Sequence, residues 1–123
     1  MSCLAKGFQK RCGLRGENLA AVFLEEKGFQ ITHRNWRYSH KEIDLIAQEE
    51  EITVFIEVRV RSDKALVPGF ESLTKKKRMA LKQASLAFLA QRPQVEFYRW
   101  DVMEYRTMDV DFQRYEVAHY ENV

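Results

Sequence analysis

Apolar and polar residues follow two different periodic patterns along this chain, and these patterns predict two helices and five strands. In two segments apolar residues recur every three or four positions, which is typical of amphipathic helices. In five others they alternate with polar residues or run on without interruption, which is typical of strands. The predicted helices span residues 14–27 and 74–91, and the predicted strands span residues 29–38, 42–48, 52–60, 95–105 and 112–120.

The order of these elements predicts an α/β fold. The succession helix-strand-strand-strand-helix-strand-strand fits a mixed sheet of about five strands flanked by helices. The strand at 52–60 is rich in β-branched residues and apolar on both faces, so we expect it at the centre of the sheet. Residues 61–73 form a long loop, with Pro68-Gly69 as its turn signal.

Length and composition fit one globular domain over residues 1–123, with residues 1–13 as a flexible or peripheral segment. Hydrophobic residues make up 46% and charged residues 31%, which excludes a disordered chain. No run approaches the roughly 18 apolar residues of a membrane-spanning helix, and the first residues lack the apolar stretch of a secretory signal. We therefore expect a cytoplasmic protein without a membrane partner, whose two cysteines are reduced thiols.

The net charge of +2 hides a separation of charge along the chain. Residues 75–82 hold five cations and no acid, whereas residues 101–123 hold six acids and two arginines. Such a separation is expected where one face of a protein meets a polyanion, although charge runs are often only solvated surfaces.

Two acidic side chains interrupt otherwise apolar strands. Asp44 and Glu57 are 13 positions apart, so a hairpin of adjacent strands can place them side by side. Paired carboxylates repel one another unless a cation lies between them, and a hard divalent ion such as Mg²⁺ or Mn²⁺ prefers oxygen ligands. Glu17, in the first helix, could complete the coordination. The pattern therefore indicates a metal site suited to phosphodiester hydrolysis.

A purely structural explanation of the same residues stays open. Arg59 shares a strand face with Glu57 and could hold a phosphate through its bidentate guanidinium. Glu57 could equally pair with Arg59 or Arg61 on a solvent-facing strand surface. Glu17 could be an exposed acid that the helix dipole favours near the N-terminus.

Four cations open the second helix directly after Thr74, its expected N-cap. Cations in a first turn oppose the helix dipole at about 0.3–1 kcal/mol each, so the run Lys75, Lys76, Lys77 and Arg78 does not favour stability. It suits a phosphate that docks at the free N–H groups with the lysines around it. A solvated basic cap is the alternative.

The chain carries six short motifs between about residue 14 and residue 105. They are Arg15-Gly16-Glu17, Asn35-Trp36-Arg37, Glu42-Ile43-Asp44-Leu45-Ile46, Val54-Phe55-Ile56-Glu57-Val58-Arg59, Ser72-Leu73-Thr74 with the lysines after it, and Trp100-Asp101-Val102. Each motif is short, but in their order and spacing they resemble the motifs of the YraN-type family of predicted endonucleases.

The resemblance implies a restriction-endonuclease-like fold, similar to that of archaeal Holliday-junction resolvases, with a PD-(D/E)xK site. By resemblance, Asp44 and Glu57 are the metal carboxylates and Glu17 is the helix acid. Arg59 occupies the family's lysine-or-arginine position. The implied activity is Mg²⁺- or Mn²⁺-dependent cleavage of DNA, branched DNA included. Fold analogy alone favours a homodimer, because two copies are needed to cut two strands symmetrically.

Two positions depart from the family pattern. His40-Lys41 stands where the family commonly has small glycines, so we expect narrower access to the metal, with His40 and Glu42 as accessory residues at the rim. Arg59 is effectively always protonated, so it cannot be the general base sometimes assigned to the lysine. Either the metal alone activates water, a helix lysine such as Lys77 takes over, or catalysis is weak or absent.

Three functions remain open from the sequence. The first is a nuclease in which Arg15 and Arg61 join the cations of the second helix in binding DNA. The second is a non-catalytic nucleic-acid-binding module with the same fold and basic surface. The third is a protein-interaction or assembly factor that uses the acidic C-terminal face.

Overall fold

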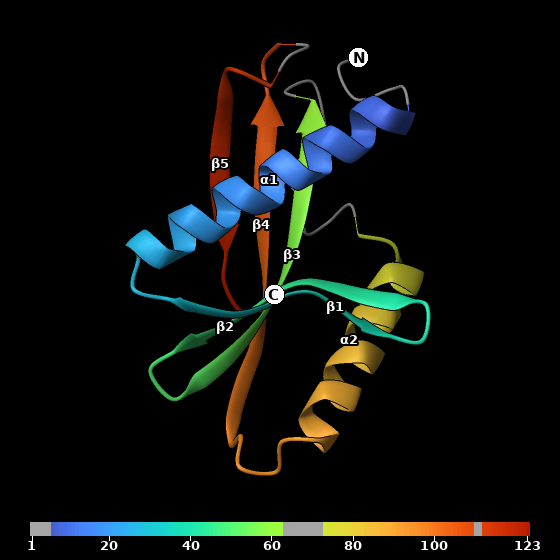
Figure 1. The fold of residues 1–123 in the computed structure, drawn as a ribbon, viewed down its shortest axis with the longest axis vertical. Coiled ribbons are helices and arrows are strands. Elements are labelled where there is room, and N and C mark those ends of the chain that lie inside the picture. Colours follow the sequence, from blue (N-terminus) through green and yellow to red (C-terminus); the bar gives the residue numbers. More distant parts are fainter. Residues whose placement is uncertain (1–5, 63–72, 110–111) are drawn as a thin grey trace.

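The computed structural model describes residues 6–62, 73–109 and 112–123, and its elements follow the predicted order (Figure 1). The predicted α/β fold with a mixed five-stranded sheet is confirmed. The helices are α1 (Lys6–Glu26) and α2 (Lys75–Ala90), and the strands are β1 (Gln30–Tyr38), β2 (Lys41–Glu49), β3 (Ile52–Ser62), β4 (Phe97–Thr107) and β5 (Tyr115–Tyr120).

Helix α1 begins earlier than the apolar pattern predicts. Residues 6–13, expected as part of a flexible or peripheral segment, form its first turns. Lysine, glutamine and arginine in this stretch favour a helix without producing an apolar period, so periodicity alone misses it. The predicted turn at Pro68-Gly69 lies outside the described residues.

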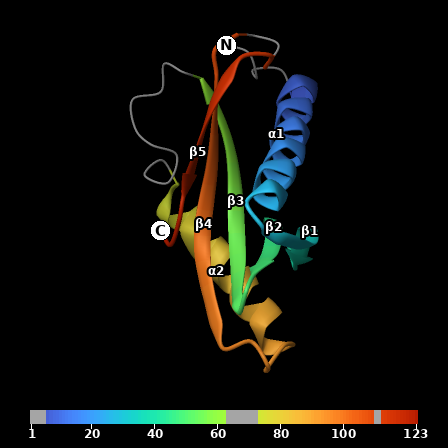
Figure 2. The same ribbon diagram turned by 90° about the vertical axis from the view of Figure 1, so that its left-hand side faces the viewer.

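Strand β3 is central, as its apolar sequence predicts. The strand order is β1-β2-β3-β4-β5, and neighbouring strands are antiparallel except β3 and β4, which are parallel. Helix α2 lies within the long connection that a parallel pair requires. Figures 1 and 2 show α1 crossing one face of the sheet and α2 lying against the other.

Each helix buries its own cluster of apolar side chains against the sheet. Ala20 and Leu24 of α1 pack in a cluster with Ile56 of β3. Leu81 and Phe88 of α2 pack in a second cluster with Phe55, the residue that precedes Ile56 in β3. Successive side chains of a strand point to opposite faces, so β3 contributes to both clusters. By the same alternation, Glu57 takes the face that α2 covers.

Gly16 allows a close approach between α1 and β3. A Cβ atom at this position would lie 2.6 Å from Cγ2 of Val60 and 3.5 Å from Cγ1 of Val58. No side chain fits there unless the helix or Val60 moves. The glycine of the Arg15-Gly16-Glu17 motif therefore brings the neighbouring acid, Glu17, close to the sheet.

Within the described ranges, no helix is long and apolar enough to cross a membrane. Cys12 is buried, with 5% of its surface exposed, and it is disulfide-bonded. The prediction of reduced thiols is therefore wrong for Cys12.

Gly16→Ala is expected to lower the free energy of unfolding by about 1–3 kcal/mol, because the new methyl group must displace Val60 or the helix. Gly13→Ala is the matched control in the same helix, since a Cβ there meets nothing within 4 Å. Alanine is favoured over glycine inside a helix by about 0.5–1 kcal/mol, so the control should be slightly more stable than wild type. Urea denaturation measures both changes, and equal stability of the two variants would contradict the close approach at Gly16.

Candidate functional site

Asp44 and Glu57 come together at the point where β2 and β3 meet. The antiparallel register pairs Leu45 with Ile56, so the next step along the two strands sets Asp44 opposite Glu57. The backbone N–H of Val58 donates a hydrogen bond to Oδ2 of Asp44 at 2.8 Å. The two carboxyl groups lie close enough for each to shift the pKa of the other. The predicted convergence of these two acids is therefore present.

Burial makes this carboxyl pair hold a proton. Burial, followed by the charge of Glu57, raises the pKa of Asp44 to about 8, against the opposing hydrogen bond from Val58. Burial also raises the pKa of Glu57, against the opposing charge of Lys77. Because Asp44, next to Glu57, keeps its proton up to about pH 8, the pair holds one proton at neutral pH.

Lys77 is the cation that α2 brings to the pair. Its Nζ atom lies 3.8 Å from Oε2 of Glu57. The Glu57 side chain is only 15% exposed, whereas that of Lys77 is 61% exposed. Thr74 caps the helix as predicted, because its Oγ1 accepts a hydrogen bond from the Lys77 backbone N–H at 3.1 Å. Arg59 acts through its charge, which lowers the pKa of Glu57.

Glu17 lies within electrostatic reach of the pair and is held by Asn35. Its charge contributes to the raised pKa values of Asp44 and Glu57. Nδ2 of Asn35 donates a hydrogen bond to Oε1 of Glu17 at 3.0 Å. Asn35 sits between Arg34, which pairs with Leu45, and Trp36, which pairs with Ile43, so the register sets Asn35 across from Asp44.

The backbone of Asn35 has a φ of 51°, in the left-handed region that asparagine tolerates better than most residues. Asn35 belongs to the Asn35-Trp36-Arg37 motif, but its sequence pattern predicts no role for it. The only available signal was an asparagine in the middle of a predicted strand, where this residue type is depleted.

The donor atoms suit a hard divalent cation. Asp44 and Glu57 offer carboxylate oxygens, and Mg²⁺ is commonly held by one or two carboxylates while it keeps several waters. Over residues 6–62, 73–109 and 112–123, no group of three or more histidine, cysteine, aspartate or glutamate side chains could hold a metal ion. The pair is therefore a two-carboxylate set, and Glu17 as a third ligand stays a prediction.

The carboxyl pair and the basic start of α2 line one cavity of about 890 Å³. The predicted rim residues His40 and Glu42 line it as well, and Glu42 forms an ion pair with Arg37 at 3.5 Å. The cavity is lined by His40, Lys41, Glu42, Asp44, Glu57, Lys75, Lys76, Lys77, Met79, Ala80, Leu81 and Gln83. Acids that favour a cation and lysines that favour an anion thus face the same space.

Arg15 and Arg61, predicted to bind nucleic acid, do not line this cavity. Nε of Arg15 donates to the backbone oxygen of Phe112 at 3.0 Å, and its guanidinium lies 5.3 Å from the centre of the Phe112 ring. Arg61 forms an ion pair at 3.3 Å with Glu104, which is 1% exposed. Both arginines are therefore engaged within the fold.

The two acids of β4, Asp101 and Glu104, are buried rather than displayed on a face. Asp101 is fully buried and accepts hydrogen bonds from Arg99, from the backbone N–H of Asn122 at 2.9 Å and from His119 at 2.7 Å. Burial alone would raise the pKa of Asp101, but the hydrogen bonds from His119 and Arg99 outweigh it, so the pKa is lowered. Sequence analysis missed this network, although Asp101 lies in a motif.

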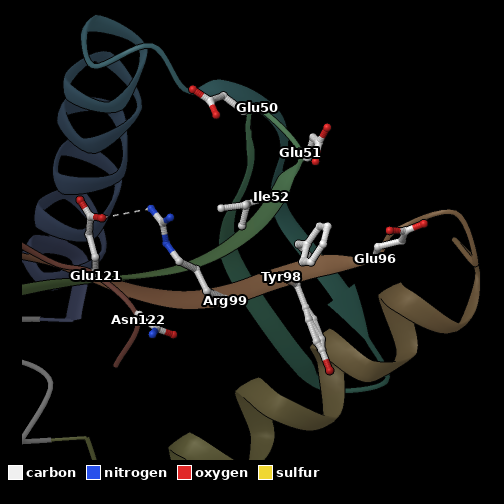
Figure 3. Close-up of a pocket in the computed structure, with 9 residues that line it drawn as sticks. Glu50, Glu51, Ile52, Glu96, Tyr98, Arg99, Glu121 and Asn122 are labelled. Carbon is white, nitrogen blue, oxygen red and sulfur yellow. Dashed lines mark ion pairs between the residues drawn. The ribbon is translucent and has the colours of Figure 1, made fainter.

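The acidic surface lies where β3 and β4 begin (Figure 3). There a hollow of about 850 Å³ is lined by Glu50, Glu51, Glu96 and Glu121 together with Arg99. Figure 3 shows Glu121 facing Arg99, at an ion-pair distance of 3.4 Å. Three of the four glutamates lie outside residues 101–123, so the C-terminal segment contributes only Glu121 to this acidic hollow.

Comparison with known proteins relates this chain to one family. The family model described as "Uncharacterised protein family UPF0102" matches residues 16–105. A UPF0102 protein of Carboxydothermus hydrogenoformans is 33% identical over 121 residues, which cover 94% of this chain and 96% of that protein. A UPF0102 protein of Clostridium perfringens is 35% identical over 114 residues, covering 92% and 93%. One of Nocardia farcinica is 37% identical over 86 residues, covering 70% and 68%.

Asp44→Asn should stabilise the protein increasingly as the pH rises. In the folded state Asp44 keeps its proton up to about pH 8, whereas the ordinary pKa is 3.8, so between these values the folded state binds more protons than the unfolded state. The free energy of unfolding of wild type therefore falls through this window and levels off above it. Asparagine cannot ionise, so its stability gain should grow by at least ~1 kcal/mol between pH 5 and pH 8.

Thermal melts in the presence of a chelator measure this gain. Glu96→Gln is the matched control, because it removes the charge of an exposed acid that lines a different hollow. A gain for Asp44→Asn that is the same at both pH values would contradict the shared proton.

Asn35→Ala should be less stable than Asn35→Gly. Both substitutions remove the amide that holds Glu17, but only alanine must place a Cβ atom at a φ of 51°. The left-handed conformation costs about 1–2 kcal/mol for such a residue, and this is the expected difference in the free energy of unfolding. Urea denaturation tests it; an alanine variant as stable as the glycine variant would show that the backbone does not require this conformation.

Proposed function

This chain belongs to family UPF0102, the YraN-type family that its motifs resemble, and we propose that it is a metal-dependent nuclease that hydrolyses phosphodiester bonds of DNA. The observation that carries the proposal is the largely buried Asp44–Glu57 pair, which lines one cavity together with Lys77, 3.8 Å from Glu57. Two largely buried carboxyl groups beside each other do not favour folding when both are ionised. Strongly shifted acids beside a charge partner in a cavity are typical of functional sites.

Asp44 and Glu57 would hold Mg²⁺ or Mn²⁺, with Glu17 as a further acid nearby. A bound ion of this kind would stabilise charge on the scissile phosphate and lower the pKa of a coordinated water. To bind it, the two carboxyl groups must release their shared proton. Occupancy of the site should therefore become more favourable as the pH rises towards 8, the pKa of Asp44.

Lys77 links the acidic pair to the phosphate-binding surface. Its ammonium group touches Glu57 on one side and is mostly exposed to the cavity on the other, so it can reach a phosphate without leaving the site. Arg59 keeps a positive charge on the same strand but cannot accept a proton. Arg59 occupies the position of the motif lysine, and among the residues that could take over the role of that lysine, this geometry supports Lys77.

DNA is the proposed partner because Lys75 and Lys76 line the same cavity as the acids. Contacts of this type neutralise phosphates and release counterions, so the affinity for DNA should fall steeply as salt rises. Branched DNA and a homodimer remain part of the proposal through fold analogy alone.

The purified protein should cleave at least one member of a panel of linear, nicked and branched DNA when Mg²⁺ or Mn²⁺ is added. Asp44→Asn and Glu57→Gln should each lower the rate by at least ~100-fold, because each removes a carboxylate that binds the ion. Lys77→Met should also lower the rate, since it removes the cation next to the pair. Gel-based cleavage assays measure all three.

Glu96→Gln is the control and should cleave at the rate of wild type, because Glu96 lines the acidic hollow and not the carboxylate cavity. The nuclease proposal is wrong if wild type cleaves no substrate with either metal, or if Asp44→Asn cleaves as fast as wild type. Salt-sensitive DNA binding that survives Asp44→Asn without any cleavage would instead favour the binding module.

A further inference from the structure

A second hollow lies beside α2, separate from the carboxylate cavity. It measures about 350 Å³ and is lined by Leu73, Arg78, Leu81, Lys82, Trp100, Val102 and Val123. Arg78 and Lys82 are four positions apart, so they share one side of the helix. Leu81 lines both hollows, which places them on either side of the stripe that α2 packs against the sheet.

One wall of this hollow is the indole ring of Trp100, which a hydrogen bond holds in position. Nε1 of Trp100 donates to Oγ of Ser85 at 3.0 Å, and that hydroxyl donates to the backbone oxygen of Leu81 at 2.7 Å. The ammonium of Lys82 lies 5.8 Å from the centre of the indole ring. The remaining lining side chains are apolar apart from Arg78, and none of the seven is acidic.

The indole ring, the apolar walls and the two cations together favour one class of ligand. An indole face with apolar walls favours a flat aromatic group, and stacking of a nucleobase on an aromatic side chain contributes about 1–3 kcal/mol. The two cations favour a group that is linked to phosphates. The volume is at the lower end of the ~300–1,000 Å³ that small-molecule sites occupy, so there is room for one base and not for a base pair with its neighbours.

We propose that this hollow receives one unpaired nucleobase, with the flanking phosphates on Arg78 and Lys82. Lys77 and Arg78 are adjacent in α2, and they face the carboxylate cavity and the base hollow respectively. A single strand that crosses the first turns of α2 would therefore meet both sites. The choice of a nucleic acid as ligand rests on the function proposed above.

The substrate class follows from the cost of freeing a base. Moving a paired base out of a duplex into a pocket costs a few kcal/mol, whereas an unpaired base needs the least free energy to enter. The site should therefore prefer single strands, or positions next to a branch or a gap, over uninterrupted duplex DNA.

Fluorescence of Trp100 can report directly on this site. The chain has two tryptophans, and Trp36 packs instead against Phe88, with ring centres 5.3 Å apart. Trp36→Phe leaves Trp100 as the single tryptophan, and Asp44→Asn in the same protein with a chelator prevents cleavage during titration. The probes are a single-stranded oligothymidylate, a strand of the same length whose sugars carry no base, and a duplex of the same length.

The oligothymidylate should quench Trp100 emission and bind about 10-fold or more tightly than the baseless strand, in line with the contribution of one stacked base. The baseless strand and the duplex should leave the emission nearly unchanged. Equal affinity for the two single strands, or emission that does not respond to thymidylate, overturns the base site.

Trp100→Leu should reduce the affinity for thymidylate to that for the baseless strand. Tyr98→Leu is the matched control: its ring lies 5.5 Å from that of Trp100 and is 42% exposed, but it does not line the hollow. It should keep the preference for thymidylate, and loss of the preference in both variants would count against the site. Circular dichroism confirms that each variant is folded. If Trp100→Leu does not fold, the difference in affinity between thymidylate and the baseless strand in the single-tryptophan protein decides the proposal, and Lys82→Gln, which removes a phosphate contact, should weaken both strands alike.

Failure of this inference and failure of the nuclease proposal can be told apart. Metal-dependent cleavage by wild type without base discrimination removes the base site and leaves the nuclease. Base discrimination without any cleavage removes the nuclease and leaves the base site. Absence of binding by every strand overturns the base site directly.

Discussion

The pairing of β2 with β3 determines where the least favourable charges of this molecule lie. Once Leu45 pairs with Ile56, the next position forces Asp44 and Glu57 to face each other at a largely buried point of the sheet. A slip of one residue would exchange the faces of every β2 side chain and expose apolar groups, so the buried core fixes the register. Hydrophobic burial thus holds together two acids that would separate in water.

The helices complete the site from different positions in the sequence. Helix α1 approaches closely because Gly16 has no side chain, and it brings Glu17 towards the acids. Helix α2 begins at its Thr74 cap and directs Lys77 to Glu57. The site therefore depends on the packing of α1, α2 and the sheet. The pKa values of its acids depend on how deeply that packing buries them.

The sequence predicts those features that depend on local pattern. Element order, the central position of β3, the Thr74 cap and the convergence of Asp44 with Glu57 follow from periodicity and from the short span of a hairpin. The left-handed backbone of Asn35 could not be predicted, because a strand pattern does not reveal a single residue of unusual φ.

Features that depend on distant partners were also missed. The ion pair of Arg61 with Glu104, 43 positions further on, could not be read from the local pattern, and nucleic-acid binding by Arg61 stays a prediction. The hydrogen-bond network of Asp101 likewise could not be predicted without knowing where residues 119–122 lie.

This network makes residues 119–122 important for the sheet. Asp101 is fully buried, and two of its hydrogen-bond donors are His119 and the backbone N–H of Asn122. Each lost donor to a buried acceptor costs about 1–3 kcal/mol. Trimming these last residues would therefore not remove a loose tail; it would strip hydrogen-bond donors from a buried carboxylate and weaken the whole sheet.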